Sequence, residues 1–114
     1  MANDIIYINL EEGMKRMMNK AKFYAKMLTK FKDDTNLNIL EEALACGDME
    51  KAQVAAHTIK GVAANLSLTE LFNQSLDVET QIKGKSLKPE SLESLKTCFA
   101  QTLNSIEEVI AKYV

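Results

Sequence analysis

The sequence predicts an all-α protein: an antiparallel four-helix bundle with a short additional N-terminal helix. The 114 residues are 46% apolar and 26% charged, which is typical of a soluble globular chain. Only four Gly and one Pro interrupt them, and apolar residues recur three and four positions apart over long stretches. No alternating strand pattern competes with this helical period. A chain of this length forms one core, so we expect a single domain over residues 1–114.

The first two helices are expected between Asn9 and Cys46. Asn9 followed by Glu12 is a helix cap with an acidic residue three positions on, and it predicts a short helix through about Met18. A longer helix should run from about Lys20 to Cys46, where Gly47 ends it, although the polar stretch 33–38 can loosen its middle. Its apolar stripe comprises Tyr24, Met27, Leu28, Phe31, Leu37, Leu40 and Leu44.

The third and fourth helices are expected to form a tight hairpin. Asp48 predicts the cap of the third helix. Ser67 with Glu70 fits a capping box, and Leu66 with Leu71 fits the matching hydrophobic staple, so the fourth helix should begin almost directly after the third. A link this short forces the two helices to be antiparallel.

A fifth helix should complete the bundle. Gly84 is expected to close the fourth helix, and Pro89 suits the first residue of the fifth. The apolar stripe of the fifth helix comprises Leu92, Leu95, Phe99, Leu103, Ile106, Val109 or Ile110, and Tyr113. Four long amphipathic helices with short links must bury their stripes against one another.

Charge and composition narrow the classes of partner. The net charge of −2 gives no global attraction to nucleic acid or to an anionic membrane. The chain has neither a basic start followed by an apolar run nor eighteen consecutive apolar residues, so we expect a cytoplasmic protein. Cys46 and Cys98 lie far apart without metal-ligand spacing and are expected to be reduced thiols.

The single histidine, His57, is expected on the outward face of the third helix. The inward stripe is Ala55, Ile59, Val62 and Leu66, and at about 100° per residue His57 lies roughly 200° from Ile59. The residues that share its outward face are Gln53, His57, Lys60, Gly61 and Ala64.

This face suits phosphoryl chemistry. A neutral imidazole nitrogen is a competent nucleophile near neutral pH. Lys60, three positions along, can offset the negative charge of a phosphoryl group on His57. Gly61 costs about 1 kcal/mol in a helix relative to alanine, and its use would be to let another protein approach His57.

Glu79 on the fourth helix is the expected partner of the imidazole. His57 lies ten positions before Ser67 and Glu79 twelve after it, so the two are at similar heights of about 15 and 18 Å from the turn. Glu79 is set among Phe72, Ser75, Leu76 and Ile82, which we expect on the inward side. A hydrogen bond from Nδ1 to the carboxylate would leave Nε2 pointing outward in the reactive tautomer.

Each of these residues also has a plainer interpretation. A lone histidine or lysine on a helix is commonly a solvated side chain, Glu79 alone fits one half of a salt bridge, and Gly61 alone fits close packing of two helices. The argument for a site is that the four converge on one exposed patch.

The run AAHTIKGVAANLSLTEL at residues 55–71 resembles the signature of histidine-containing phosphotransfer domains of two-component phosphorelays. In that family an Ala-His-x-Leu/Ile-Lys-Gly stretch is followed by small residues ending in Asn-Leu. The resemblance extends to NLEEGMKRM at residues 9–17, to the EEALxxGD pattern at residues 41–48, and to Val78 with Glu79. Two departures are Ser67, where many members have glycine, and Asn9, where many have aspartate.

The resemblance implies that His57 is the phosphorylated residue, Lys60 the phosphate-side cation, Gly61 the access position and Glu79 the orienting partner. It implies a monomeric phosphoryl carrier without its own kinase or nucleotide site. The partners would be receiver domains of response regulators and a hybrid sensor histidine kinase. No cofactor is expected on this chain, because Mg²⁺ and the catalytic carboxylates would come from the receiver.

Two alternatives remain. A non-catalytic helical scaffold or adaptor would bind a partner through the His57 face without accepting phosphate. A metal or haem bundle is the weaker alternative, because one exposed histidine lacks partners at ligand spacing.

A docking surface is also expected near His57. Met14, Met17 and Met18 crowd a first helix too short to bury them all in one stripe, and flexible Met side chains suit a surface that meets several partners. We expect the exposed part of this cluster on the same side as His57, with Gln53, Gly61 and Ala64 giving close approach.

Overall fold

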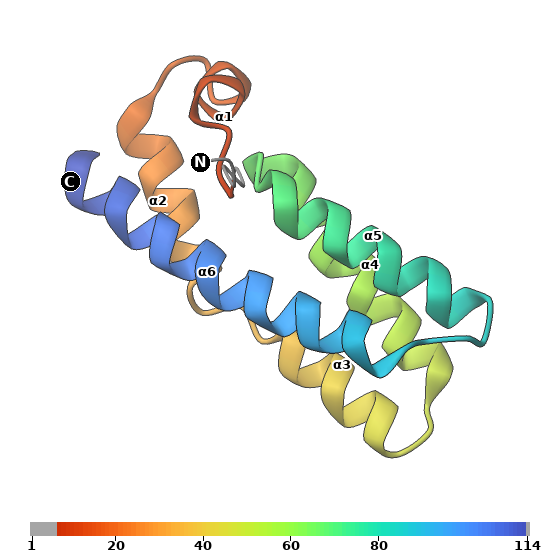
Figure 1. Cartoon of the computed structure of the whole chain (residues 1–114). Helices are drawn as coiled ribbons and strands as arrows, with labels where there is room; N and C mark the ends of the chain where they lie inside the picture. Colours follow the sequence, from red (N-terminus) through yellow and green to blue (C-terminus); the bar gives the residue numbers. More distant parts are fainter. Residues whose placement is uncertain (1–6, 114) are drawn as a thin grey trace, which may run out of the picture.

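The computed structural model describes residues 7–113, apart from the side chain of Tyr113, and this range is folded into six helices without a strand (Figure 1). They are α1 (Leu10–Arg16), α2 (Ala21–Phe31), α3 (Asn36–Ala45), α4 (Met49–Leu66), α5 (Thr69–Lys83) and α6 (Pro89–Tyr113). The apolar stripe that was expected to reach Tyr113 therefore ends, in the described part, at Ile110.

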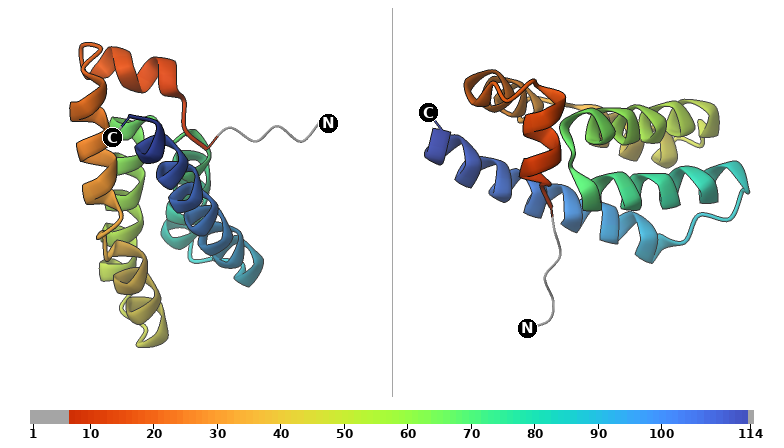
Figure 2. Two further views of the ribbon diagram at one scale, coloured as in Figure 1. Left: turned by 90° about the vertical axis from the view of Figure 1, so that its left-hand side faces the viewer. Right: turned by 90° about the horizontal axis from the view of Figure 1, so that it is seen from above.

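The helices form an antiparallel bundle with a small helix at one end, as predicted. α2 and α3 follow one another in the same direction along one side of the molecule (Figure 2). α3 packs against α4, α4 against α5, α5 against α6, and α6 returns to α2. The short helix α1 contacts α2 and α4 at the end of the bundle where α4 turns into α5.

The predicted apolar stripes meet in one core. The side chains of the core that are almost fully excluded from solvent come from α2 to α6 and from the turn before α5. The largest of them are Tyr24, Leu28, Leu40, Ile59, Leu68, Leu71, Leu95 and Ile106. Because three of these eight residues precede α4 and two follow α5, the α4–α5 hairpin is held from both sides.

Several of the predicted helix ends are confirmed. The Asn9 side chain accepts a hydrogen bond from the backbone N–H of Glu12 at 3.2 Å, and Asp48 accepts one from Lys51 at 3.1 Å. Both are N-cap contacts that satisfy amide groups at the start of a helix. Gly84 follows the last residue of α5, and Pro89 is the first residue of α6.

The long second helix expected from Lys20 to Cys46 is wrong, because it is broken between Phe31 and Asn36. The Asp34 carboxylate accepts hydrogen bonds from the backbone N–H of Asn36 at 2.8 Å and from its side-chain amide. An aspartate that bonds to the backbone two residues ahead gives the chain an alternative to continuing the helix. The polar stretch that was expected to loosen the helix therefore ends α2 and starts α3.

The capping box at Ser67 is also wrong. Ser67 is the C-cap of α4, with a left-handed backbone (φ 57°, ψ 40°), and α5 begins only at Thr69. The left-handed region favours glycine, which fits the glycine that many members of the resembled family carry at this position. The Ser67 hydroxyl donates instead to the Glu12 carboxylate of α1 at 2.8 Å.

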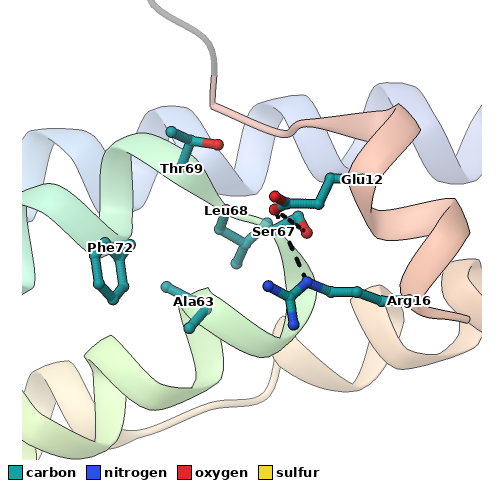
Figure 3. A pocket seen from close by; sticks show the side chains of 8 residues that line it. Glu12, Arg16, Ala63, Ser67, Leu68, Thr69 and Phe72 are labelled. Atoms are coloured by element: carbon teal, nitrogen blue, oxygen red, sulfur yellow. Dashed lines mark hydrogen bonds and ion pairs between the residues drawn. The ribbon is translucent and has the colours of Figure 1, made fainter.

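The helix α1 is fastened to the α4–α5 turn by these contacts. Figure 3 shows the Glu12 carboxylate joined by dashed lines to Ser67 and to Arg16, whose Nε lies 3.8 Å from that carboxylate. The Tyr24 hydroxyl donates to the Leu66 carbonyl at 2.6 Å, and its burial, together with the charge of Glu12, raises its pKa to about 12. The end of α4 is therefore closed by side chains from α1 and α2.

The first helix is shorter than expected. It ends at Arg16 rather than near Met18, because Met18 and Asn19 have positive φ angles of 55° and 59°. Two successive left-handed residues cannot continue a right-handed helix.

Candidate functional site

The position of His57 follows from the pattern of small and apolar residues in α4. Ala55, Ala56 and Ile59 are buried against the bundle, so the residues between them are turned outward. The His57 side chain keeps 65% of its surface exposed. The outward orientation predicted from the helical period is confirmed.

Glu79 of α5 contacts the imidazole as predicted from the hairpin register. Its carboxylate Oε2 lies 2.9 Å from His57 Nδ1, and the residue is only 2% exposed. A carboxylate that is ionised can only accept a hydrogen bond, so Nδ1 must carry the proton. The lone pair of neutral His57 is then on Nε2.

The ionised state of Glu79 follows from its surroundings. Burial by itself raises the pKa of this carboxyl group, but hydrogen bonds from Lys60 and His57 and the positive charges of Lys60 and Lys83 lower it by more. The net pKa lies below the ordinary value of 4.5. Glu79 is therefore negative at neutral pH.

Two lysines flank the carboxylate, and only one of them was predicted. Lys60 Nζ lies 2.8 Å from Glu79 Oε1 and forms an ion pair with it. The Lys60 side chain is 22% exposed, so it is held against Glu79 instead of being a free cation on the surface. Lys83 Nζ, one helical turn beyond Glu79, lies 3.5 Å from Oε2 and is 56% exposed.

Gly61 leaves open space one turn from His57. It is exposed, and a Cβ atom added to it would meet no atom of the chain within 4 Å. Close packing of two helices within this chain therefore does not explain the glycine. Gly13 is the glycine with that role, because a Cβ atom there would overlap the Tyr24 ring.

The predicted inward face of α5 needs one correction. Phe72 is half-buried, and Ser75 and Ile82 are buried as expected, but Leu76 is 41% exposed. Val78, the residue before Glu79, takes the inward position instead and is fully buried.

The methionines expected to form a docking surface are divided by the structure. Met14 and Met17 are half-buried against the core, whereas Met18 is 77% exposed, so part of the cluster is exposed as expected. Gln53 lines the shallow pocket at His57, together with Val54, which is 61% exposed. Ala64 lies farther along α4, in the pocket between α1 and Phe72.

Comparison with known families identifies the family to which this chain belongs. Residues 26–108, more than two thirds of the chain, match the model of the Hpt domain family. This chain belongs to the Hpt domain family. Searches of the curated proteins and of the solved structures found no match.

Membership of the Hpt family fixes the general role of the fold. Hpt domains carry phosphoryl groups on histidine in two-component phosphorelays, and they are phosphocarriers rather than catalysts. The family interacts with receiver domains of response regulators and kinases. The match spans α3, α4 and α5, so the helix with His57 and the helix with Glu79 both lie inside it.

Two general features of the described residues complement this result. Within residues 7–113, no helix has the length and apolar content that a membrane crossing requires. The same part of the chain contains no group of three His, Cys, Asp or Glu residues arranged to hold a metal ion.

Sequence reasoning missed Lys83 and Val54 as neighbours of His57. A signal for Lys83 was present, since it lies four residues after Glu79 and therefore on the same face of α5. Val54 lies three residues before His57, but a valine in an amphipathic helix is usually assigned to the core. The helical period was nevertheless a signal, because three residues at about 100° each place Val54 only about 60° from His57 on the outward face.

Proposed function

We propose that this Hpt domain accepts a phosphoryl group on Nε2 of His57 from the phosphoaspartate of one receiver and passes it to another. The observation that supports this most is the hydrogen bond between Nδ1 and the buried Glu79 carboxylate, because it selects the tautomer with the lone pair on the exposed nitrogen. Membership of the family establishes histidine phosphotransfer as the general role, and we propose Nε2 of His57 as the atom that bears the phosphoryl group.

The transfer step conserves atoms and charge without an external base. The Nε2 lone pair attacks phosphorus, the N–P bond forms, and the P–O bond to the receiver's aspartate breaks, which leaves an aspartate carboxylate. The imidazole keeps its Nδ1 proton and gains a positive charge, which the adjacent Glu79 carboxylate stabilises through a charge-assisted hydrogen bond. Transfer to the next receiver is the reverse reaction.

Glu79 acts as a positioning residue in this proposal. The imidazole would otherwise rotate about χ2 and exchange tautomers, since it is mostly exposed. The loss of a hydrogen bond to a charged group costs about 1.5–3 kcal/mol, which corresponds to a rate decrease of roughly ten- to a hundredfold. Glu79→Ala should therefore raise the activation free energy of phosphoryl transfer by more than it lowers the free energy of unfolding.

Lys60 and Lys83 supply positive charge beside the phosphoryl group. Both ammonium groups contact the Glu79 carboxylate, and Oε2 of the same carboxylate contacts His57. The two ammonium groups therefore lie close to the imidazole. A phosphoryl group brings additional negative charge and competes with Glu79 for these cations. Lys60 is better placed than Lys83 to stabilise the phosphoryl group, because it lies one turn from His57 on the same helix and its ammonium group is held in place by Glu79.

The receiver is proposed to supply everything that this chain lacks for the step. Mg²⁺ would be bound by the receiver, and the partners would include receivers of response regulators and of a hybrid sensor kinase. This chain contributes the nucleophile, its orientation, two cations and the open approach at Gly61. A monomer suffices, because all these groups come from one hairpin.

The docking surface around His57 is proposed to combine polar and apolar contacts. Gln53, Gly61 and Ala64 lie along α4, and the exposed Val54 lies beside His57. Met18 is the methionine most available to a partner, while Met14 and Met17 offer only part of their surface. Met18→Ala should weaken receiver binding with nearly unchanged helicity, because Met18 is 77% exposed.

The proposed function is tested by incubating the chain with a receiver that carries labelled phosphate on aspartate. We expect labelled phosphate on the chain that is acid-labile and alkali-stable, and none on His57→Gln, which should fold normally because the side chain is exposed. Equal labelling of His57→Gln would exclude His57 as the acceptor. A folded wild-type chain that binds receivers but takes no phosphate would favour the scaffold alternative.

A further inference from the structure

Positive charge is concentrated at one end of this chain. Half of the 14 basic residues lie between positions 15 and 32, and no Asp or Glu lies between positions 13 and 32. They are Lys15, Arg16, Lys20, Lys22, Lys26, Lys30 and Lys32. The whole chain has a net charge of −2, so this segment is strongly positive within a chain that is slightly negative.

Contacts within the fold account for only two of these seven residues. Arg16 pairs with Glu12, and Lys32 pairs with Glu107 of α6. The other five make no ion pair within residues 7–113. Bundle stability therefore does not explain them.

Three of the unpaired lysines form a stripe on α2. Lys22, Lys26 and Lys30 are four residues apart and all exposed, on the face opposite the buried Tyr24 and Leu28. We call them the lysine stripe. Like charges four residues apart destabilise a helix, so the stripe is unfavourable for α2 itself.

The lysine stripe begins at a groove shared with the helix that carries His57. The groove between α2 and α4 has the buried Phe31 and Leu66 at its floor and the exposed Lys30 and Asn65 at its mouth. Asp34, in the link between α2 and α3, is the acidic residue that lines this groove.

The two helices present their outward faces on the same side of the molecule. From the mouth of the groove, steps of four residues lead from Asn65 through Gly61 to His57 on α4, and from Lys30 through Lys26 to Lys22 on α2. α2 and α4 are antiparallel (Figures 1 and 2). From the groove, the two rows therefore run in opposite directions along the bundle axis, and each row turns away from the groove toward solvent.

The end of the stripe at Lys30 lies at the distance expected for the rim of an interface centred on His57, and Lys26 and Lys22 lie outside that rim. At about 1.5 Å per residue, Lys30 lies about 12 Å along the bundle axis from His57, and Lys26 about 18 Å. A typical interface buries about 800 Å² of each partner, which corresponds to a disc of about 16 Å radius. A receiver docked on His57 therefore places its edge near Lys30, while Lys26 and Lys22 lie beyond the edge and act on the receiver through their charge alone.

We propose that the lysine stripe attracts and orients receiver domains whose surface around the phosphoaspartate is acidic. This inference rests on the proposed function, because the phosphoaspartate and the carboxylates that hold Mg²⁺ make the approaching face of the receiver negative. Lysines at a rim raise the association rate and its dependence on salt, with little effect on the chemical step. Phe23, which is 48% exposed on the same side of α2, offers an apolar contact among these charges.

The test compares two variants with the same net charge. Lys26→Gln/Lys30→Gln removes two positive charges from the stripe. Lys88→Glu makes the same change of net charge immediately before α6, a helix that packs against α5 and α2 rather than α4. The probe is a receiver with an acidic surface around its aspartate, carrying labelled phosphate on that aspartate. The second-order rate constant and the maximal rate at saturating receiver are measured by rapid quench at increasing NaCl concentration.

We expect the stripe variant to lower the second-order rate constant by roughly three- to tenfold at low ionic strength and to flatten its salt dependence. The maximal rate should stay unchanged, and Lys88→Glu should change the second-order rate constant less than the stripe variant does. Equal rate constants and equal salt slopes for the two variants would overturn the inference. Absence of any transfer to the wild-type chain would instead refute the proposed function.

A membrane surface is the competing occupant, and a second measurement addresses it. Cosedimentation with vesicles of phosphatidylglycerol and phosphatidylcholine should show no binding that depends on the lysine stripe. If wild-type protein binds these vesicles, the stripe variant does not, and the transfer rates of the two are equal, then the stripe serves an anionic lipid surface and the inference is wrong.

Discussion

Replacement of Gly61 by alanine separates the cost of this glycine to folding from its use in binding. Gly61 lies in the middle of α4, is exposed, and has no atom of the chain within 4 Å of the place where a Cβ atom would be. Its backbone is helical, so the methyl group of alanine causes neither strain nor overlap. Only the conformational freedom of glycine in the unfolded chain then differs between the two proteins.

The expected stabilisation follows from helix propensity. Alanine is favoured over glycine by about 1 kcal/mol in a helix interior, which raises the melting temperature of a domain of this size by roughly 3–6 °C. Thermal unfolding followed by circular dichroism measures this shift. A lower melting temperature for Gly61→Ala would refute the reasoning, because it would mean that the glycine packs against something within this chain.

A longer side chain at the same place should affect transfer and not folding. Gly61→Gln should keep the fold but hold a docked receiver away from His57, and a displacement of about 1 Å costs about a hundredfold in rate. Ala100→Gln, on the exposed face of α6, is the matched control. Equal transfer rates for the two variants would show that Gly61 is not the approach to His57.

Three further outcomes are expected. Gly13→Ala should destabilise the protein by about 1–3 kcal/mol in chemical denaturation, because the added methyl group overlaps the Tyr24 ring; a stability equal to wild type would contradict this packing. Because the pKa of Glu79 is lowered in the folded state, its contribution to stability is present above the ordinary value of 4.5 and is lost as the pH falls through the folded pKa, so Glu79→Gln should flatten the acid side of the stability profile. Lys60→Ala should shorten the lifetime of the phosphohistidine more than Lys83→Ala, since Lys60 is the more buried and the closer to Glu79; the opposite order would make Lys83 the principal cation.

Much of the site was predictable because it depends on the helical period within one hairpin. The outward orientation of His57 follows from the burial of its neighbours in α4, and the contact with Glu79 follows from equal distances to the α4–α5 turn. That estimate tolerates the error in the position of the turn, because moving the start of α5 by two residues changes the height by only about 3 Å.

The parts that were not predicted depend on contacts between distant segments. Ser67 was a reasonable N-cap from local sequence, but Glu12 of α1 bonds to its hydroxyl and its backbone is left-handed. The break after Phe31 depends on which of two local options Asp34 takes. Lys60 was expected to offset the charge of a phosphoryl group on His57, and its ion pair with Glu79 is seen only in the folded hairpin.

The central claim concerns which atom of His57 bears the phosphoryl group. Because His57 is the only histidine, labelling histidine with ¹⁵N gives signals from a single imidazole ring. After transfer from a phosphorylated receiver, ¹⁵N and ³¹P nuclear magnetic resonance should show a phosphorus–nitrogen coupling at Nε2 and a retained proton on Nδ1. Phosphate on Nδ1, or on another residue with an unmodified imidazole, would contradict the account.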